Sequence, residues 1–122
     1  NIERRRENLD IWLKNLNSSK FISSFKTWGN SSFALPLIMQ SIIRHKLDDV
    51  CKILEDEKVE YRVGTAGGGN QARQPYLKKF PYRVVGTLSQ ADYIHDYALY
   101  IGNHTDLNEE QIINLCKKLN NV

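Results

Sequence analysis

The sequence predicts an α+β fold, a two-layer sandwich in which helices cover one small sheet. Three segments carry apolar residues at helical spacing, around residues 2–16, 41–54 and 108–119. Short segments between them have the patterns of strands, apolar on both faces over 31–39 and alternating over 59–63. The predicted order is helix, strand, helix, strand, glycine loop, strand, short helix, strand, helix. Helices placed in this way can all cover one face of a sheet.

The first helix is predicted over residues 2–16 from the spacing of Ile2, Leu9, Trp12, Leu13 and Leu16. Residues 17–30 are rich in Ser and Asn and predict a loop. The strand over 31–39 contains Pro36, which lacks a backbone donor and is therefore expected at a sheet edge or a bulge. Its apolar character on both faces favours a buried position.

Ser41 is expected to cap the second helix, whose apolar stripe is Ile43, Leu47, Val50, Cys51 and Leu54. The alternation of Val59, Tyr61 and Val63 then predicts a half-buried strand that ends at the glycine loop. Residues 82–85 (YRVV) are a second short strand candidate.

A short helix is expected from Ser89, as its cap, to about Asp96, followed by a strand over 97–101. Asn108 and Gln111 have the spacing of a capping box for the final helix. That helix is expected to bury Ile112, Leu115, Cys116 and Leu119.

Length and composition indicate one ordinary globular domain. The 122 residues are 41% hydrophobic and 25% charged, with a net charge of +3 that is too small and dispersed to argue for nucleic acid as a partner. Cys51 and Cys116 are expected to be buried free thiols in a reducing compartment. We see neither an apolar run of membrane-spanning length nor a signal peptide, so we expect a cytoplasmic protein. The chain begins without Met inside a predicted helix, and we expect it to be a fragment of a longer protein.

The glycine loop, GTAGGGNQARQP over 64–75, is the most unusual stretch. Gly67, Gly68 and Gly69 permit positive φ angles or close backbone approach. A nucleotide-binding P-loop would need Lys and Ser or Thr where Asn70 and Gln71 stand, and the spacing of a Rossmann fingerprint is missing.

Two loops offer groups that could bind a ligand. The loop from Gly67 to Gln74 carries the amides of Asn70, Gln71 and Gln74 with the guanidinium of Arg73, which suits a polar, anionic or sugar-like ligand. Gly102-Asn103-His104 follows the last strand and adds an imidazole. The alternative is that these residues only make turns and that Arg73 is solvated.

The sequence shows no pattern typical of a metal site or of a catalytic nucleophile. His45, His95 and His104 share no metal-ligand spacing with Cys or carboxylates, so no metal site is expected. There is no nucleophile elbow, although a triad assembled in three dimensions stays open. No catalytic residue is predicted within this chain.

Several short motifs, in order, resemble a known family. They are Arg4-Arg5 with Glu7-Asn8, Gly69-Asn70, Arg73-Gln74-Pro75, Ala91-Asp92-Tyr93-Ile94 and Gly102-Asn103-His104. Together they resemble the C-terminal portion of DegT/DnrJ-type nucleotide-sugar aminotransferases and dehydratases. The branch they resemble most is that of CDP-4-keto-6-deoxyglucose 3-dehydrases and related lipopolysaccharide-sugar enzymes.

The resemblance implies a C-terminal small α+β domain with a mainly antiparallel sheet, of the kind found in fold-type I pyridoxal-phosphate (PLP) enzymes. Residues 1–30 would be an entering helix and connecting loop, and residues 31–122 the small domain. The parent would be a homodimer that binds PLP or pyridoxamine phosphate (PMP), mainly in a large domain. The Schiff-base lysine, or the histidine that replaces it in 3-dehydrases, would lie in that missing domain, so this chain alone should be inactive.

The same resemblance implies that Asn70, Arg73, Gln74, Asn103 and His104 line the active-site cleft and approach a nucleotide sugar or a glutamate amino donor. The expected activity is that of a 3-dehydrase on a nucleotide-linked 4-keto-6-deoxy sugar. A 4-aminotransferase that uses glutamate stays open, because this chain holds no residue that separates the two. A non-catalytic domain binding nucleic acid or protein is the alternative of another class.

The resemblance also implies exposed aromatic surface. Trp12, Phe21, Phe25 and Trp28 lie in segments expected to pack against the missing large domain, and we therefore expect exposed apolar surface near the N-terminus or a dimer that covers it.

Overall fold

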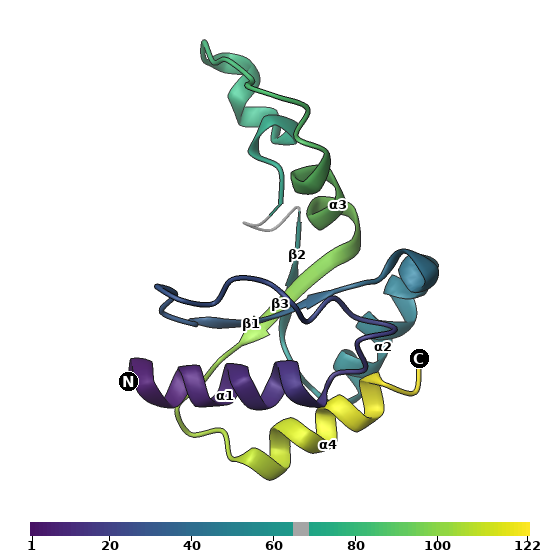
Figure 1. Cartoon of the computed structure of the whole chain (residues 1–122). Coiled ribbons are helices and arrows are strands. Elements are labelled where there is room, and N and C mark those ends of the chain that lie inside the picture. The colour runs from purple at the N-terminus through teal and green to yellow at the C-terminus, as the bar shows by residue number, and fades with distance from the viewer. Residues whose placement is uncertain (65–68) are drawn as a thin grey trace.

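The computed structural model describes residues 1–64 and 69–122 (Figure 1). In chain order the elements are helix α1 (Ile2–Asn15), strand β1 (Ala34–Ile38), 3-10 helix η1 (Ser41–Lys46), helix α2 (Leu47–Asp56), strand β2 (Tyr61–Val63), 3-10 helices η2 (Gln71–Arg73) and η3 (Pro75–Lys79), helix α3 (Ser89–Tyr97), strand β3 (Ala98–Gly102) and helix α4 (Glu109–Leu119). The predicted α+β class and the antiparallel sheet are confirmed.

The sheet has the order β1-β3-β2, and both outer strands run antiparallel to β3. Leu35 and Tyr61 both lie opposite Ile101, while Leu37 and Val63 lie opposite Leu99. Alternate residues of a strand point to the same face, so these side chains share the core side of the sheet. Pro36 lies in β1, an edge strand, as predicted.

Helices α1 and α4 pack against each other on the core side of the sheet (Figure 1). The core contains Leu9 and Trp12 of α1, Leu35 and Leu37 of β1, and Cys116 of α4, all with at most 2% of their surface exposed. Helix α1 is therefore part of the same core as the sheet. The division of the chain at residue 30 stays a prediction.

Two of the expected helix caps are wrong, and one is confirmed. Ser41 is the first residue of η1 and Ser89 the first residue of α3, and neither helix has a side-chain cap. The backbone ahead of α3 turns at Leu88 instead, which has a φ of 53°. Asn108 and Gln111 form the predicted capping box of α4.

The expected strand at residues 82–85 is wrong. This stretch belongs to an arm, residues 71–88, that projects from the body between β2 and α3 (Figure 1). Tyr82, Val84 and Val85 are exposed on it, at 51%, 49% and 73%. The apolar pattern is that of a strand, but within the described residues 82–85 pair with no other strand.

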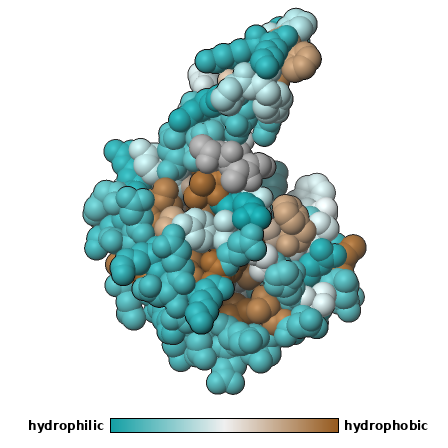
Figure 2. Space-filling view, turned by 180° about the vertical axis from the view of Figure 1, so that it is seen from behind, coloured by the Kyte–Doolittle hydropathy of each residue, from teal (hydrophilic) through white to brown (hydrophobic). Residues whose placement is uncertain are grey.

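The four aromatic side chains of the N-terminal segments differ in exposure. Trp12 and Phe21 are fully buried, whereas Phe25 is partly buried and Trp28 is 82% exposed. The backbone of Phe21 makes an isolated bridge to Met39, the Ile22 amide donates to the Ile38 carbonyl at 2.8 Å, and the Phe21 side chain belongs to the core. From behind, apolar surface shows in the hollowed middle of the body between hydrophilic side chains (Figure 2).

Candidate functional site

The start of the candidate loop is held against the backbone and ring of His95 on α3. Gly69 has a φ of 77°, and a Cβ added there would lie 2.7 Å from Nδ1 of His95 and 2.9 Å from its Cα. A Cβ on Gly64, at the end of β2, would lie 2.7 Å from the same Cα. Glycine is therefore required at both positions by close approach to α3. Gly67 and Gly68 lie outside the described residues.

Asn70 is the central hydrogen-bonding residue of the loop and is 6% exposed. Its backbone amide donates to Nδ1 of His95 at 3.1 Å, and its side-chain amide donates to Oδ1 of Asp92 at 2.8 Å. Its side-chain oxygen accepts from the Ala72 amide at 3.0 Å and caps η2. These three contacts hold the loop to α3 and shape its first turn.

Arg73 forms ion pairs with two carboxylates on α3. Its guanidinium lies 2.9 Å from Oδ1 of Asp96 and 3.5 Å from Oδ1 of Asp92. The hydrogen bond from Arg73 is the main cause of a lowered pKa of Asp96, and the same contact raises the pKa of Arg73. The Arg73 side chain is 41% exposed, so solvent still reaches the guanidinium beside these two ion pairs.

Gln74 connects the loop to the end of strand β2. Its side-chain amide donates to the carbonyl oxygen of Gly64 at 3.3 Å. Asn70, Arg73 and Gln74 are thus brought together by the structure, all on one short turn fixed to α3 and the end of β2.

Asn103 is a buried structural link, 5% exposed. Its side-chain amide donates to the carbonyls of Arg5 at 2.8 Å and Ser32 at 2.7 Å, and its side-chain oxygen accepts from Asn8 at 3.0 Å. Asn8 also donates to the carbonyl oxygen of His104 at 3.0 Å. This network joins α1, the segment before β1 and the end of β3.

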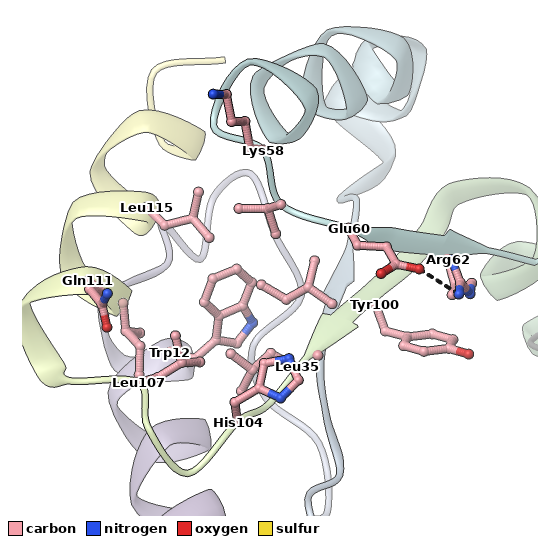
Figure 3. A pocket seen from close by; sticks show the side chains of 14 residues that line it. Trp12, Leu35, Lys58, Glu60, Arg62, Tyr100, His104, Leu107, Gln111 and Leu115 are labelled. Carbon is pink, nitrogen blue, oxygen red and sulfur yellow. Dashed lines mark ion pairs between the residues drawn. The ribbon is translucent and has the colours of Figure 1, made fainter.

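His104 is exposed and lines a groove of about 530 Å³ between the sheet and α4 (Figure 3). Trp12, Leu35, Leu107 and Leu115 give the groove apolar walls. Charged side chains stand at its border: Lys58, Glu60 and Arg62, of which Glu60 and Arg62 pair at 2.6 Å. An apolar groove with a few polar groups is a general feature of binding sites.

The two candidate loops lie at opposite ends of β3. Val63, which ends β2, is opposite Leu99 near the start of β3, whereas Asn103 and His104 follow its last residue, Gly102. A five-residue strand separates its ends by roughly 15 Å. The structure therefore does not bring His104 together with Arg73 around one ligand-sized space.

The sequence reasoning missed three site residues, all on α3: Asp92, His95 and Asp96. Asp92 and Asp96 have the i, i+4 spacing that places two carboxylates on one face of a helix, and this was the available signal for a partner of Arg73. No sequence signal pointed to His95, because its role depends on how closely the backbone of the loop approaches.

The three arginines of α1 all make internal contacts. Arg4 pairs with Glu7 at 3.1 Å and donates to the Leu107 carbonyl at 2.6 Å. Arg5 donates to the Asn1 carbonyl and Arg6 to the Asn30 carbonyl. Within the described residues, only Arg4 of the three is paired with a carboxylate, whereas Arg5 and Arg6 contact backbone carbonyls at 3.4 and 3.5 Å.

In the part of the chain that the structure describes, no three His, Cys, Asp or Glu side chains are grouped as a metal site would need. No helix among the described residues has both the length and the apolar character needed to cross a membrane. Both cysteines are free; Cys116 is buried, as predicted, whereas Cys51 is only partly buried.

The sequence has two informative relatives among characterised proteins. The GDP-4-keto-6-deoxy-D-mannose 3-dehydratase of Yersinia pseudotuberculosis is 31% identical over 121 residues, which are 96% of this chain and 30% of the relative. The lipopolysaccharide biosynthesis protein RfbH of Salmonella typhimurium is 32% identical over 82 residues, 67% of this chain and 18% of the relative. The chain thus spans less than a third of the length of either relative. No family model matches it.

Solved structures show the same fold. A GDP-4-keto-6-deoxymannose-3-dehydratase with a trapped PLP-glutamate geminal diamine superposes with a TM-score of 0.79 at 24% identity, over 97% of this chain and 31% of that one. The E. coli GDP-4-keto-6-deoxy-D-mannose-3-dehydratase with bound hydrated PLP gives 0.77 at 24% identity, over 97% and 30%.

The fold and the sequence relatives together define the chain as a small α+β domain of the PLP-dependent nucleotide-sugar enzymes of the DegT type. It is homologous to the C-terminal region of GDP-4-keto-6-deoxymannose 3-dehydratase and RfbH, the dehydratase branch. The resemblance found in the sequence is confirmed at this level. The 3-dehydratase relative is named for a GDP-linked sugar, where the sequence motifs had suggested a CDP-linked one.

Proposed function

We propose that this chain is the C-terminal domain of an enzyme that removes the C3 hydroxyl of a nucleotide-linked 4-keto-6-deoxy sugar in lipopolysaccharide sugar biosynthesis. The observation that carries the proposal is the 31% identity to a 3-dehydratase along 96% of this chain. We propose a cytoplasmic homodimer as the working state, with glutamate as the amino donor that converts PLP to PMP.

The cofactor does not fit the residues of this chain. A PLP site needs a lysine that forms the Schiff base, or a histidine that replaces the lysine. Residues 69–74 and helix α3 carry no lysine, and the Nδ1 atom of His95 on α3 already accepts a hydrogen bond from the Asn70 amide. We therefore propose that the cofactor is bound by another part of the longer protein, the part that corresponds to the sequence of the relatives outside this chain. There it would supply carbanion stabilisation.

For this chain we propose a positioning and binding role. The turn of Asn70, Arg73 and Gln74 would form one wall of the cleft, with Arg73 as the exposed donor for a phosphate or carboxylate oxygen that approaches from solvent. The contacts of Asn70 and Gln74 would hold that guanidinium in place. A fixed donor is more effective than a free one, because its orientation is already set before the ligand binds.

Asn103 and His104 would act at the other end of β3. We propose that Asn103 supports this end of the sheet from inside, since its donors and its acceptor are used within the chain. His104 would present its ring at the mouth of the apolar groove. This groove lies at the opposite end of β3 from the Arg73 turn.

The proposal is tested on the longer protein that contains this chain. Purified protein should carry the visible absorbance of PLP, and added glutamate should shift it to that of PMP. The 122-residue chain alone, as the matched control, should show neither. Absorbance in the control would contradict our assignment of the cofactor, and its absence from the longer protein would contradict the enzyme class.

A binding module for nucleic acid is the alternative of another class. Its phosphate contacts would release counterions, so retention on a polyanion column would fall steeply with salt. We expect weak retention, because the net charge of the chain is only +3. Strong, salt-sensitive retention without bound cofactor would favour the binding module.

A further inference from the structure

His95 on α3 contacts the candidate loop, although no sequence motif pointed to this residue. Its Nδ1 accepts the Asn70 amide at 3.1 Å, and its ring and backbone leave room only for glycine at positions 64 and 69. It stands between Asp92 and Asp96, the two carboxylates that pair with Arg73. The side chain thus touches the loop where the loop meets α3.

We propose that His95 is a positioning residue, which sets the backbone of residues 69–74 and through it the direction of the Arg73 guanidinium. The inference rests on the proposed function, in which that turn faces the nucleotide sugar. His95 itself touches neither substrate nor cofactor in this proposal, and acts only through Asn70 and Arg73.

The hydrogen bond fixes the protonation of the ring. An imidazole that accepts an N–H bond at Nδ1 must carry its proton on Nε2. A side chain without an acceptor at the place of Nδ1 would leave the Asn70 amide without this partner, and the loop would lose one of its contacts with α3.

Charged groups surround His95 on several sides. On its own helix these are Asp92 and Asp96, and Arg73 approaches from η2. His95 also lines a groove shared with α2 and β2, whose titratable side chains are Asp48, Cys51, Lys52, Glu55, Asp56 and Tyr61. None of these groups replaces Nδ1 as the acceptor for the Asn70 amide.

The test measures hydrogen exchange of the Asn70 amide in the 122-residue chain by NMR, expressed as a protection factor. His95→Asn keeps an acceptor near the Nδ1 position. His95→Ala removes the acceptor. His45→Asn changes an exposed histidine on η1 and is the matched control.

We expect His95→Ala to lower the protection of the Asn70 amide roughly five- to tenfold relative to the native chain, the loss of one hydrogen bond. His45→Asn should keep the native protection. His95→Asn should keep most of it, because it restores an acceptor. A merely space-filling His95 would give no rescue by Asn, and that result, or unchanged protection in His95→Ala, overturns the proposal.

A parallel titration with GDP separates this inference from the proposed function. GDP should shift the amide signals of Arg73 and Gln74 in the native chain and in His95→Asn, but less in His95→Ala. If exchange behaves as expected while GDP shifts nothing, the positioning contact stands and the substrate role of the turn is contradicted. GDP shifts of equal size in all three proteins would overturn the positioning role.

Discussion

The side-chain amide of Asn8 donates a hydrogen bond of 3.0 Å to the side-chain oxygen of Asn103, across 95 positions of sequence. Asn8 is fully buried and Asn103 is 5% exposed, so this contact lies in the interior. It fastens the first helix to the end of the central strand. Buried polar groups are costly unless they are paired, and the fold therefore depends on both residues.

Asn103→Ala should lower the free energy of unfolding by about 2–4 kcal/mol, because the carbonyls of Arg5 and Ser32 lose their donor. Urea unfolding followed by tryptophan fluorescence measures the change. Asn114→Ala, on the exposed face of α4, is the control and should stay within about 0.5 kcal/mol of the native chain. Equal stability of the two variants would show that the buried network contributes little.

Gly69→Ala should destabilise the chain more than Gly86→Ala. Both glycines have a similar positive φ, 77° and 80°, so both variants carry the same backbone strain. Only position 69 has His95 within contact distance of an added Cβ, whereas nothing lies within 4 Å at position 86. The difference between the two free energies of unfolding isolates the contact with α3. If the two losses match, the loop is not packed against His95 as described.

The carboxyl group of Asp96 should titrate below its usual pKa of 3.8, because Arg73 donates a hydrogen bond to it. A depressed carboxyl pKa contributes stability that is present above the unfolded value and is lost as the pH falls through the folded value. The ion pair between Arg73 and Asp96 should therefore weaken only below about pH 3.8. The effect on the free energy of unfolding should be small, because both side chains are exposed.

Carbon-detected NMR of Asp96 measures this pKa directly. Arg73→Gln should raise it toward the usual value, and Arg83→Gln, an exposed arginine of the arm, should leave it unchanged. A pKa that does not respond to Arg73→Gln would mean that the ion pair is absent in solution.

The two thiols should differ in reactivity. Burial raises the pKa of Cys116 to about 12, and it also raises that of the partly buried Cys51. At about pH 8 only about one Cys116 in ten thousand would be a thiolate, even before its lack of access is considered. Labelling with an alkylating reagent, followed by mass spectrometry, should modify Cys51 first and Cys116 only upon unfolding. Equal labelling rates would contradict the buried position of Cys116.

The sequence was informative where local pattern decides structure. The spacing of Leu9 and Trp12 in α1 and the capping box of Asn108 predicted their helices because those signals are local. The edge position of Pro36 followed from its missing donor.

Other features depend on contacts between distant segments. Local pattern could not predict three of these features. They are the ion pairs of Arg73 with Asp92 and Asp96, the burial of Phe21 beside Met39, and the separation of His104 from the glycine loop. The strand pattern at residues 82–85 failed for the same reason, since a strand needs a neighbour to pair with.

The most direct test of the proposed function is the product that the longer protein makes from GDP-4-keto-6-deoxymannose with glutamate, measured by mass spectrometry. We expect a sugar nucleotide that is lighter than the substrate by one oxygen atom, because the C3 hydroxyl is replaced by hydrogen. A product in which the keto oxygen has been exchanged for an amino group would contradict it and identify an aminotransferase.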